Sequence, residues 1–359
     1  MDAGKWISLF MLLFALIGAA DRAVGCRFGP GKAFERGFEA AGTLILAMIG
    51  PFAIAPLIAK LLSPVVTPAC RKIGLDPSLL AGLLLADDSG GWPLALALAE
   101  DPAVGRLNGS VVGSTMGCAV MFAFPVGFAL TPKERKPLLA KGLAIGLCAV
   151  PVACFVGGLC LGVGIGTLIW NLVPLLIVSA LFVAGLLFAE RLTVKIVTAF
   201  GYVLTAILTA ALAAAMVIKV MDREVPDFGT FDEGMLIIGN IVIFLAGAFT
   251  ILFFLEKLGM PLFERIGRRG GMDGASILGL ITTSVNAIPM FGMTKDMNDR
   301  GLVVNAAFLV PASFMIGDHL AFQLSVDPST GVPLIVGKLA GGIAAILLAL
   351  FLTREKRAG

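Results

Sequence analysis

Long apolar segments follow one another along almost the entire chain, and each could cross a lipid bilayer as a helix. A membrane-spanning helix needs about 20 mainly apolar residues. The expected uninterrupted spans are 4–20, 38–62, 104–130, 138–165, 167–189, 194–220, 235–255, 302–324 and 334–352. Charged residues make up 14% of the chain, whereas soluble domains contain about 25%. The sequence therefore predicts an all-α polytopic membrane protein.

Two further apolar segments, 78–99 and 275–297, are shorter and interrupted. In the first, the run ADDSGGWP at 86–93 contains two adjacent carboxylates, Asp87 and Asp88, followed by two glycines and a proline. An ionised aspartate at the bilayer centre costs about 2.5–3.5 kcal/mol, and glycine and proline break helical backbone. Irregular, charged backbone is tolerated at membrane depth where protein or a water-filled cavity surrounds it. We therefore predict that 86–93 is the break in a discontinuous helix that lines a binding site.

The two interrupted segments occupy matching positions in an internal repeat. At one constant offset the chain aligns with itself without a gap, and 86–93 falls over 283–290. We predict two inverted-topology repeats, 1–165 and 194–359, joined by a linker helix at 166–193. Paired interrupted helices in inverted repeats are typical of secondary transporters, whose site lies near the membrane midplane. Aligned pairs include Gly37 with Gly234, Lys60 with Lys257, Asp76 with Asp273 and Asn108 with Asn305.

Basic residues indicate the side of the membrane on which a loop lies. The loop 131–137 contains Lys133, Arg135 and Lys136, and an excess of lysine and arginine marks cytoplasmic loops. The acidic loop 222–233 then falls outside. This assignment requires each interrupted segment to enter and leave on one side, and it gives the two repeats opposite orientations.

The polar residues around the first break favour a cationic ligand. The half-helix 78–86 ends at Asp87 and Asp88, so the negative end of its dipole adds to the charge of the carboxylates. Trp92 offers an aromatic face for a cation–π contact. Neutral side chains that could bind a ligand hydroxyl are Ser89, Asn286, Asn108 and Asn305. For the last two, hydrogen bonding between helices is the alternative role.

A second polar site lies within the expected span 302–324. Asp318 and His319 are neighbours there, and His319 is the single histidine of the chain. Ionisable residues inside a membrane are functional candidates, and histidine changes its charge near neutral pH. We predict a proton relay or a ligand contact at this pair. The alternative is a structural role in which Asp318 satisfies backbone groups beside Pro311.

Several motifs resemble one family of transporters, the ethanolamine-utilisation permeases of the EutH family. The motifs are LADDSGG (85–91), NAIPMFGMTKDMNDRG (286–301), GDHLAF (317–322) and VGKLAGG (336–342). The resemblance implies a permease that imports ethanolamine across the bacterial inner membrane for ethanolamine catabolism. In the family pattern L-A-x-D-x-G-G, Asp88 matches the carboxylate and Asp87 the variable position. Since we expect adjacent side chains to point apart, the resemblance implies that Asp88 holds the substrate ammonium.

Other functions remain as alternatives. A transporter or facilitative channel for another small amine or cation would share these features, and coupling to protons, to sodium or to neither stays open. An intramembrane aspartyl enzyme would use Asp88 and Asp318, but it needs a G-x-G-D run, and Met315 replaces the first glycine. We therefore predict no enzyme. The cysteines show no metal-ligand spacing, so we predict no metal and no cofactor. The net charge of +3 suggests no nucleic-acid partner, and a homo-oligomer in the lipid bilayer is compatible with the sequence.

Overall fold

Helices form all of the regular structure in the computed structural model, which describes residues 3–259, 261, 265, 267 and 269–353. The long helices are α1 (Ala3–Ala23), α3 (Ala41–Lys72), α8 (Lys136–Cys160), α9 (Ile165–Phe188), α10 (Glu190–Val220), α11 (Phe231–Phe254) and α17 (Gly331–Leu352). The shorter ones are α2 (Pro30–Glu39), α4 (Leu79–Leu84), α5 (Gly91–Leu98), α6 (Pro102–Leu107), α7 (Phe124–Leu130), α13 (Gly274–Val285), α14 (Ile288–Met293), α15 (Asp299–Ala312) and α16 (Asp318–Val326). The 3₁₀ helices are η1 (Asp87–Ser89), η4 (Lys133–Arg135) and η6 (Pro328–Thr330). The π-helical stretches are η2 (Asn108–Gly117), η3 (Ala119–Ala123) and η5 (Leu255–Gly259). Residues 354–359 of the expected second repeat lie outside the described residues.

Eight stretches of the described chain are long and apolar enough to span a membrane, which confirms the expected polytopic helical fold. Three of them, α1, α9 and α10, bury no more than 28% of their most apolar stretch inside the protein. Their exposed side chains include large apolar groups such as Trp6, Leu181 and Val217. Because large exposed apolar surfaces mark membrane or protein contacts, we assign these three helices to the lipid-facing surface.

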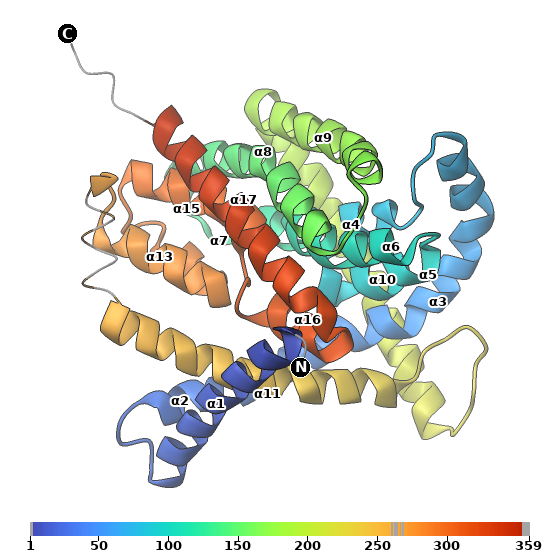
Figure 1. Ribbon diagram of the computed structural model, residues 1–359, viewed down its shortest axis with the longest axis horizontal. Helices are drawn as coiled ribbons and strands as arrows, with labels where there is room; N and C mark the ends of the chain where they lie inside the picture. Colours follow the sequence, from blue (N-terminus) through green and yellow to red (C-terminus); the bar gives the residue numbers. More distant parts are fainter. Residues whose placement is uncertain (1–2, 260, 262–264, 266, 268, 354–359) are drawn as a thin grey trace.

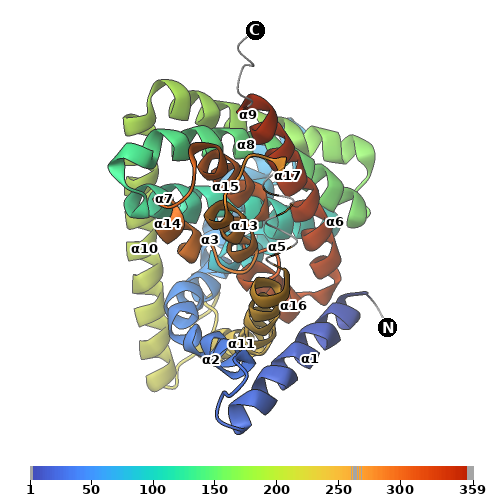
Figure 2. The same cartoon turned by 90° about the vertical axis from the view of Figure 1, so that its left-hand side faces the viewer.

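The helices form two groups that meet around the interrupted segments. One group consists of α8 with α9, α15 and α17 packed against it, and the other of α11 with α1, α2, α3 and α16. Figure 1 shows α8 and α9 at the top of the molecule, α1, α2 and α11 at the bottom, and α17 running from the top down to α16. In the side view of Figure 2, α5 and α13 lie between these groups. The α4–η1–α5 segment packs against η2 and α3, so its break lies inside the protein.

The expected continuous span 302–324 is wrong, because the chain leaves the helix between α15 and α16. Pro311 lacks the amide hydrogen that a continuing helix needs, and Phe314 takes a left-handed backbone conformation with φ 56°. The linker bonds instead to the end of α13. The amide of Phe314 donates to the Thr283 carbonyl and that of Ile316 to the Ser284 carbonyl, both at 2.9 Å. The second half of the chain therefore contains two helix breaks that are hydrogen-bonded to each other.

Each expected interrupted segment begins and ends at a shared carboxylate. Asp76 accepts hydrogen bonds from the amide of Ser78, at the start of α4, and from the amides of Glu100 and Asp101, beyond α5. Asp273 likewise accepts from the amides of Ser276, in α13, and Asn298, beyond α14. A hydrogen bond requires its atoms to be about 3 Å apart. The two ends of each segment therefore lie together, with the break as the tip of a hairpin.

A widened helix supports the first break. The helical stretch Pro102–Leu130 is π-helical through η2, and every residue of η2 is buried. Such widened turns are frequent at functional sites. Gly113 is one of its residues, and a Cβ there would lie 3.1 Å from the amide nitrogen of Asp87. The absence of a side chain at Gly113 thus lets the break approach this helix closely.

Candidate functional site

Two adjacent carboxylates converge at the break between α4 and α5. The chain becomes extended at Leu85 and Ala86, turns through η1, and leaves through Gly90 at φ 102°, a conformation that favours glycine. Asp87 is fully buried and Asp88 half-buried. One oxygen of each, together with a ring nitrogen of His319, lie within 4.8 Å of one another.

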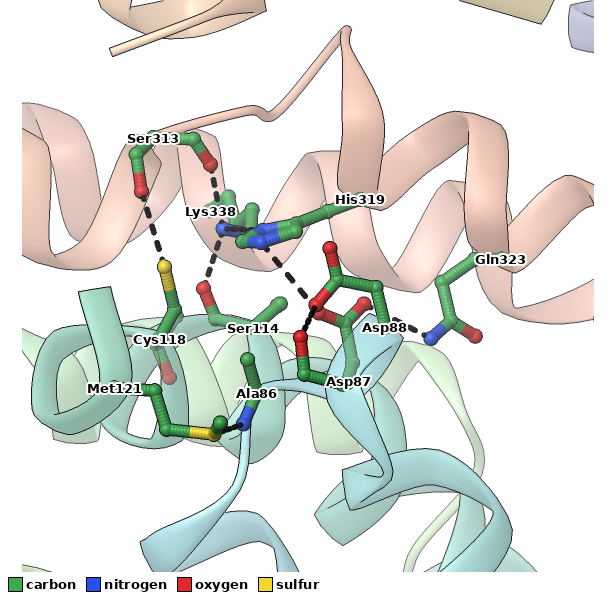
Figure 3. Close-up of polar contacts among 12 residues, drawn as sticks. Ala86, Asp87, Asp88, Ser114, Cys118, Met121, Ser313, His319, Gln323 and Lys338 are labelled. Carbon is green, nitrogen blue, oxygen red and sulfur yellow. Dashed lines mark hydrogen bonds and ion pairs between the residues drawn. The ribbon is translucent and has the colours of Figure 1, made fainter. Parts of the chain in front are cut away.

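Our expectation that Asp87 and Asp88 point apart is wrong. Figure 3 shows both carboxylates directed toward the His319 ring. The reason is that η1 is a 3₁₀ turn. Successive side chains in such a turn differ in direction by about 120° around the axis, whereas in an extended strand they point to opposite faces. Two neighbouring side chains can therefore reach the same space from one turn.

Protein groups hold Asp87 from two directions. Gln323 in α16 donates from Nε2 to Asp87 Oδ2 at 3.1 Å, and Gln323 Oε1 accepts from Thr330 Oγ at 2.8 Å, which fixes the amide orientation. Asp87 Oδ1 lies 3.5 Å from His319 Nε2. Among the described residues this oxygen has no hydrogen-bond partner. Asp87 therefore keeps one buried acceptor available.

Lys338 completes the site from α17. It is fully buried, and its Nζ donates to the carbonyl of Ser114 at 2.7 Å and to that of Ser313 at 2.8 Å. Its third neighbour is His319 Nδ1 at 3.0 Å. The two carbonyls accept from Lys338 Nζ, and the direction of the third contact follows the tautomer of His319. Lys338, His319 and Asp87 thus form a continuous polar chain through the imidazole ring (Figure 3).

Sequence reasoning missed Lys338 and Gln323. Lys338 was part of the motif VGKLAGG, but we gave it no role. The signal was present, because a lysine in the middle of an apolar helix is costly in a membrane unless it has a partner. Gln323 carried a weaker signal, since neutral polar side chains commonly join membrane helices. What the sequence lacked was the fold that brings α16 and α17 to the first break.

The remaining predicted residues near the break lie in three different environments. Ser89 donates to Asp88 Oδ1 at 3.0 Å and belongs to the polar cluster. Asp318 is half-buried in the first turn of α16 and interacts electrostatically with Asp88. Trp92 is 5% exposed and packs in an apolar cluster with Phe322 and other side chains. The Trp92 ring is thus part of the wall behind the break.

Two of the predicted asparagines, Asn108 and Asn305, lie away from the carboxylates. Asn108 donates to Ser78 Oγ at 2.9 Å and accepts from Asn171 at 2.7 Å, at the end of α4 opposite the break. Asn305 donates to the carbonyls of Ser276 and Gly301 at 2.8 and 2.9 Å. These contacts fit the alternative role of joining helices. The third asparagine, Asn286, lies at the second break, where its side chain accepts a hydrogen bond from the amide of Ile288.

The arrangement suits a small cation. Asp87, Asp88 and His319 present two oxygens and one nitrogen to a common point, and this set could also ligate a metal ion. Carboxylates bind an ammonium through charge-assisted hydrogen bonds. Two of these three groups are shielded from solvent: the His319 side chain is 3% exposed and that of Asp87 is fully buried.

Comparisons with known proteins identify the family of this chain. The chain matches the family model "Ethanolamine utilisation protein, EutH" over residues 3–352. It is 38% identical over 356 residues to the probable ethanolamine permease EutH of Listeria monocytogenes, covering 99% of this chain and 95% of that protein. It is 36% identical to the uncharacterized protein YxeR of Bacillus subtilis over 359 residues, covering 100% and 97% of the two chains. The probable ethanolamine permease EutH of Escherichia coli is 34% identical over 397 residues, with 100% and 97% covered. No solved structure matches. The motifs and the comparisons agree: this chain is a multi-pass bacterial membrane protein that belongs to the EutH family.

Proposed function

We propose that this protein is a permease that carries ethanolamine across the bacterial inner membrane, with the substrate ammonium held at the Asp87–Asp88 break. Two relatives are named as probable ethanolamine permeases. The observation that supports this site most strongly is the unpaired, buried Oδ1 of Asp87, for which the described residues supply no donor. Buried polar atoms are normally hydrogen-bonded. An acceptor left open beside a second carboxylate favours a cationic donor.

Charge balance supports an ammonium substrate. When ionised, Asp87 and Asp88 carry two negative charges, and the buried Lys338 ammonium carries one positive charge. One further cation makes this group neutral, and burying an uncompensated charge is costly. The Ser89 hydroxyl, which now donates to Asp88, can both donate and accept. We propose that Ser89 binds the substrate hydroxyl, with Asp318, Asn286 and the Trp92 wall at the edge of the site.

We also propose that the protein consists of two inverted repeats, 1–165 and 194–359, joined by the linker helix 166–193. The matched contacts of Asp76 and Asp273 support this arrangement, because the two residues are aligned in sequence and tie equivalent hairpins. The aligned residues Asp101 and Asn298 also cap equivalent helices, α6 and α15. Inverted repeats allow one half to move relative to the other around a fixed site.

Opposite orientation of the repeats can be tested by labelling single cysteines. In a background without the natural cysteines, we expect a cysteine at Asp227 to react with an impermeant reagent from outside. A cysteine at Lys133 should react from the cytoplasmic side. Lys133 is preferred to its neighbour Arg135, because Arg135 donates to Asp299 and to the carbonyl of Met297. Reaction of both positions from the same side would contradict the topology.

Transport measurements distinguish a carrier from a facilitative channel for small amines. Asp87 and His319 are buried inside the protein, which supports a carrier that exposes the substrate to one side at a time. We expect vesicles containing the protein to accumulate labelled ethanolamine above the external concentration when an ion gradient is imposed. A carrier should also exchange internal unlabelled substrate for external label. Equilibration without accumulation or exchange would favour a channel.

A further inference from the structure

We propose that a cavity between α7, the start of α8 and the first turns of α10 binds one anionic phospholipid from the surrounding membrane. The cavity has a volume of about 540 Å³. Figure 2 shows α7 beside α10 at the edge of the molecule, and the two helices contact each other. None of the residues that line the cavity belongs to the polar cluster at the Asp87–Asp88 break. The proposal is therefore independent of ethanolamine transport.

The cavity contains an excess of positive charge. Its lining includes three basic side chains, Lys136, Arg191 and Lys195, and one acidic side chain, Glu190. None of the four forms an ion pair with another residue that the structure describes. Arg191 and Lys195 are one helical turn apart on α10, so they lie on the same face of it. Arginine and lysine both form charge-assisted hydrogen bonds to phosphate oxygens. The cavity is therefore suited to a phosphate group.

The rest of the lining is mainly apolar. From α10 it includes Val194, Ala199 and Tyr202, on the helix face that carries the two cations. From α7 it includes Phe128 and Ala129. The cavity can be reached from the bilayer, because α10 belongs to the lipid-facing surface and buries 22% of its most apolar stretch. A molecule that fills this cavity needs both an anionic part and an apolar part.

The length of α10 places the cations at the level of the lipid headgroups. The helix has 31 residues and is about 46 Å long, whereas the hydrocarbon core of a bilayer is about 30 Å thick. Its run without charged residues extends from 196 to 218 and is about 34 Å long. Arg191 and Lys195 therefore lie at the border of the hydrocarbon, and Ala199 and Tyr202 lie within it. A phospholipid has its charge and its chains in this same order.

The expected topology places this cavity at the leaflet that carries negative charge. Lys136 belongs to the loop 131–137, which we predict to be cytoplasmic. The cytoplasmic leaflet has a negative surface potential, and basic pockets between membrane helices on that side bind anionic lipid headgroups. A soluble anion such as glycerol phosphate would contact the cations but leave the apolar lining uncovered. The two parts of the cavity together favour a phospholipid with a net negative charge.

The test measures the binding of dioleoyl phosphatidylglycerol to the purified full-length protein. Native mass spectrometry of the protein in a neutral detergent gives the number of bound lipids and the affinity of each one. We expect one lipid that binds more tightly than the others, and weaker binding of phosphatidylcholine with the same chains. Arg191→Gln combined with Lys195→Gln should weaken the tight binding about 30-fold, because each basic side chain near anionic headgroups contributes a factor of about five. Ala199→Phe keeps every charge and should also weaken it, because the new ring fills the apolar part of the cavity.

A matched control is Lys141→Gln combined with Lys295→Gln. Both lysines are exposed, and neither forms an ion pair with another described residue. This variant removes the same two charges outside the cavity and should keep the wild-type affinity. Equal weakening in the two double variants would overturn the proposal, because it would show general attraction of anionic lipid. Wild-type affinity in Ala199→Phe would also overturn it, as would displacement of the lipid by an equal concentration of glycerol phosphate, since a soluble anion would then occupy the site.

Discussion

Replacing Asp88 with Asn is expected to weaken ethanolamine binding about 10- to 150-fold, which corresponds to about 1.5–3 kcal/mol for a hydrogen bond to a charged group. Asn keeps the size of the side chain but removes the charge that attracts an ammonium. Asp87→Asn should cost less, because Gln323 already donates to Oδ2 of Asp87, so that only Oδ1 is open to the ligand. Calorimetric titration of the purified, folded variants measures both effects.

A matched control for this comparison is Asp222→Asn. Asp222 lies in an exposed loop after α10 and takes a left-handed conformation, φ 51°, which asparagine tolerates. This substitution removes the same charge far from the break and should leave the affinity unchanged. Wild-type affinity in folded Asp88→Asn would remove Asp88 from the binding site, whatever the control shows.

The second large effect concerns stability. Lys338→Met is expected to destabilise the protein by about 3–5 kcal/mol, because removal of one partner from a buried charged group leaves the other uncompensated. The substitution also leaves the Ser114 and Ser313 carbonyls without their buried donor. Methionine fills nearly the same volume, so loss of packing contributes little. A denaturant titration of the protein in mixed micelles measures the change in the free energy of unfolding.

A double-mutant cycle shows whether this loss is electrostatic. If Lys338 balances Asp87, adding Asp87→Asn to Lys338→Met should recover part of the stability, with a coupling energy of about 0.5–3 kcal/mol. Lys141→Met on the exposed face of α8 serves as the control and should change the stability by no more than about 0.5 kcal/mol. Strictly additive losses would mean that Lys338 and Asp87 do not interact.

The membrane-spanning helices and the first break could be predicted because each depends on local composition. A run of about 20 apolar residues has few alternatives to a helix in lipid, and the run at 86–93 concentrates charges and helix breakers. The span 302–324 was harder to predict. Pro311 alone does not decide whether a membrane helix kinks or stops, and here the linker is held by carbonyls of Thr283 and Ser284, which are distant in sequence.

The set of residues that meet in the candidate site depends more on tertiary structure than the helices and the first break do. Asp87, Asp88, Ser89, Asp318 and His319 were found as polar residues in apolar surroundings. Which of the ionisable residues meet depends on how α16 and α17 pack against the break, and that packing is non-local. His319 consequently contacts Lys338 and Asp87, whereas the sequence suggested its neighbour Asp318 as the partner.

The central claim is that ethanolamine binds at the Asp87–Asp88 break, and a structure of the full-length protein with bound ethanolamine, determined by electron cryomicroscopy, tests it most directly. The account predicts density for the ligand between the two carboxylates and His319, with the ammonium about 2.7–2.9 Å from a carboxylate oxygen of Asp88. Ethanolamine found elsewhere in the protein, with this cluster unchanged at saturating ligand, would contradict it.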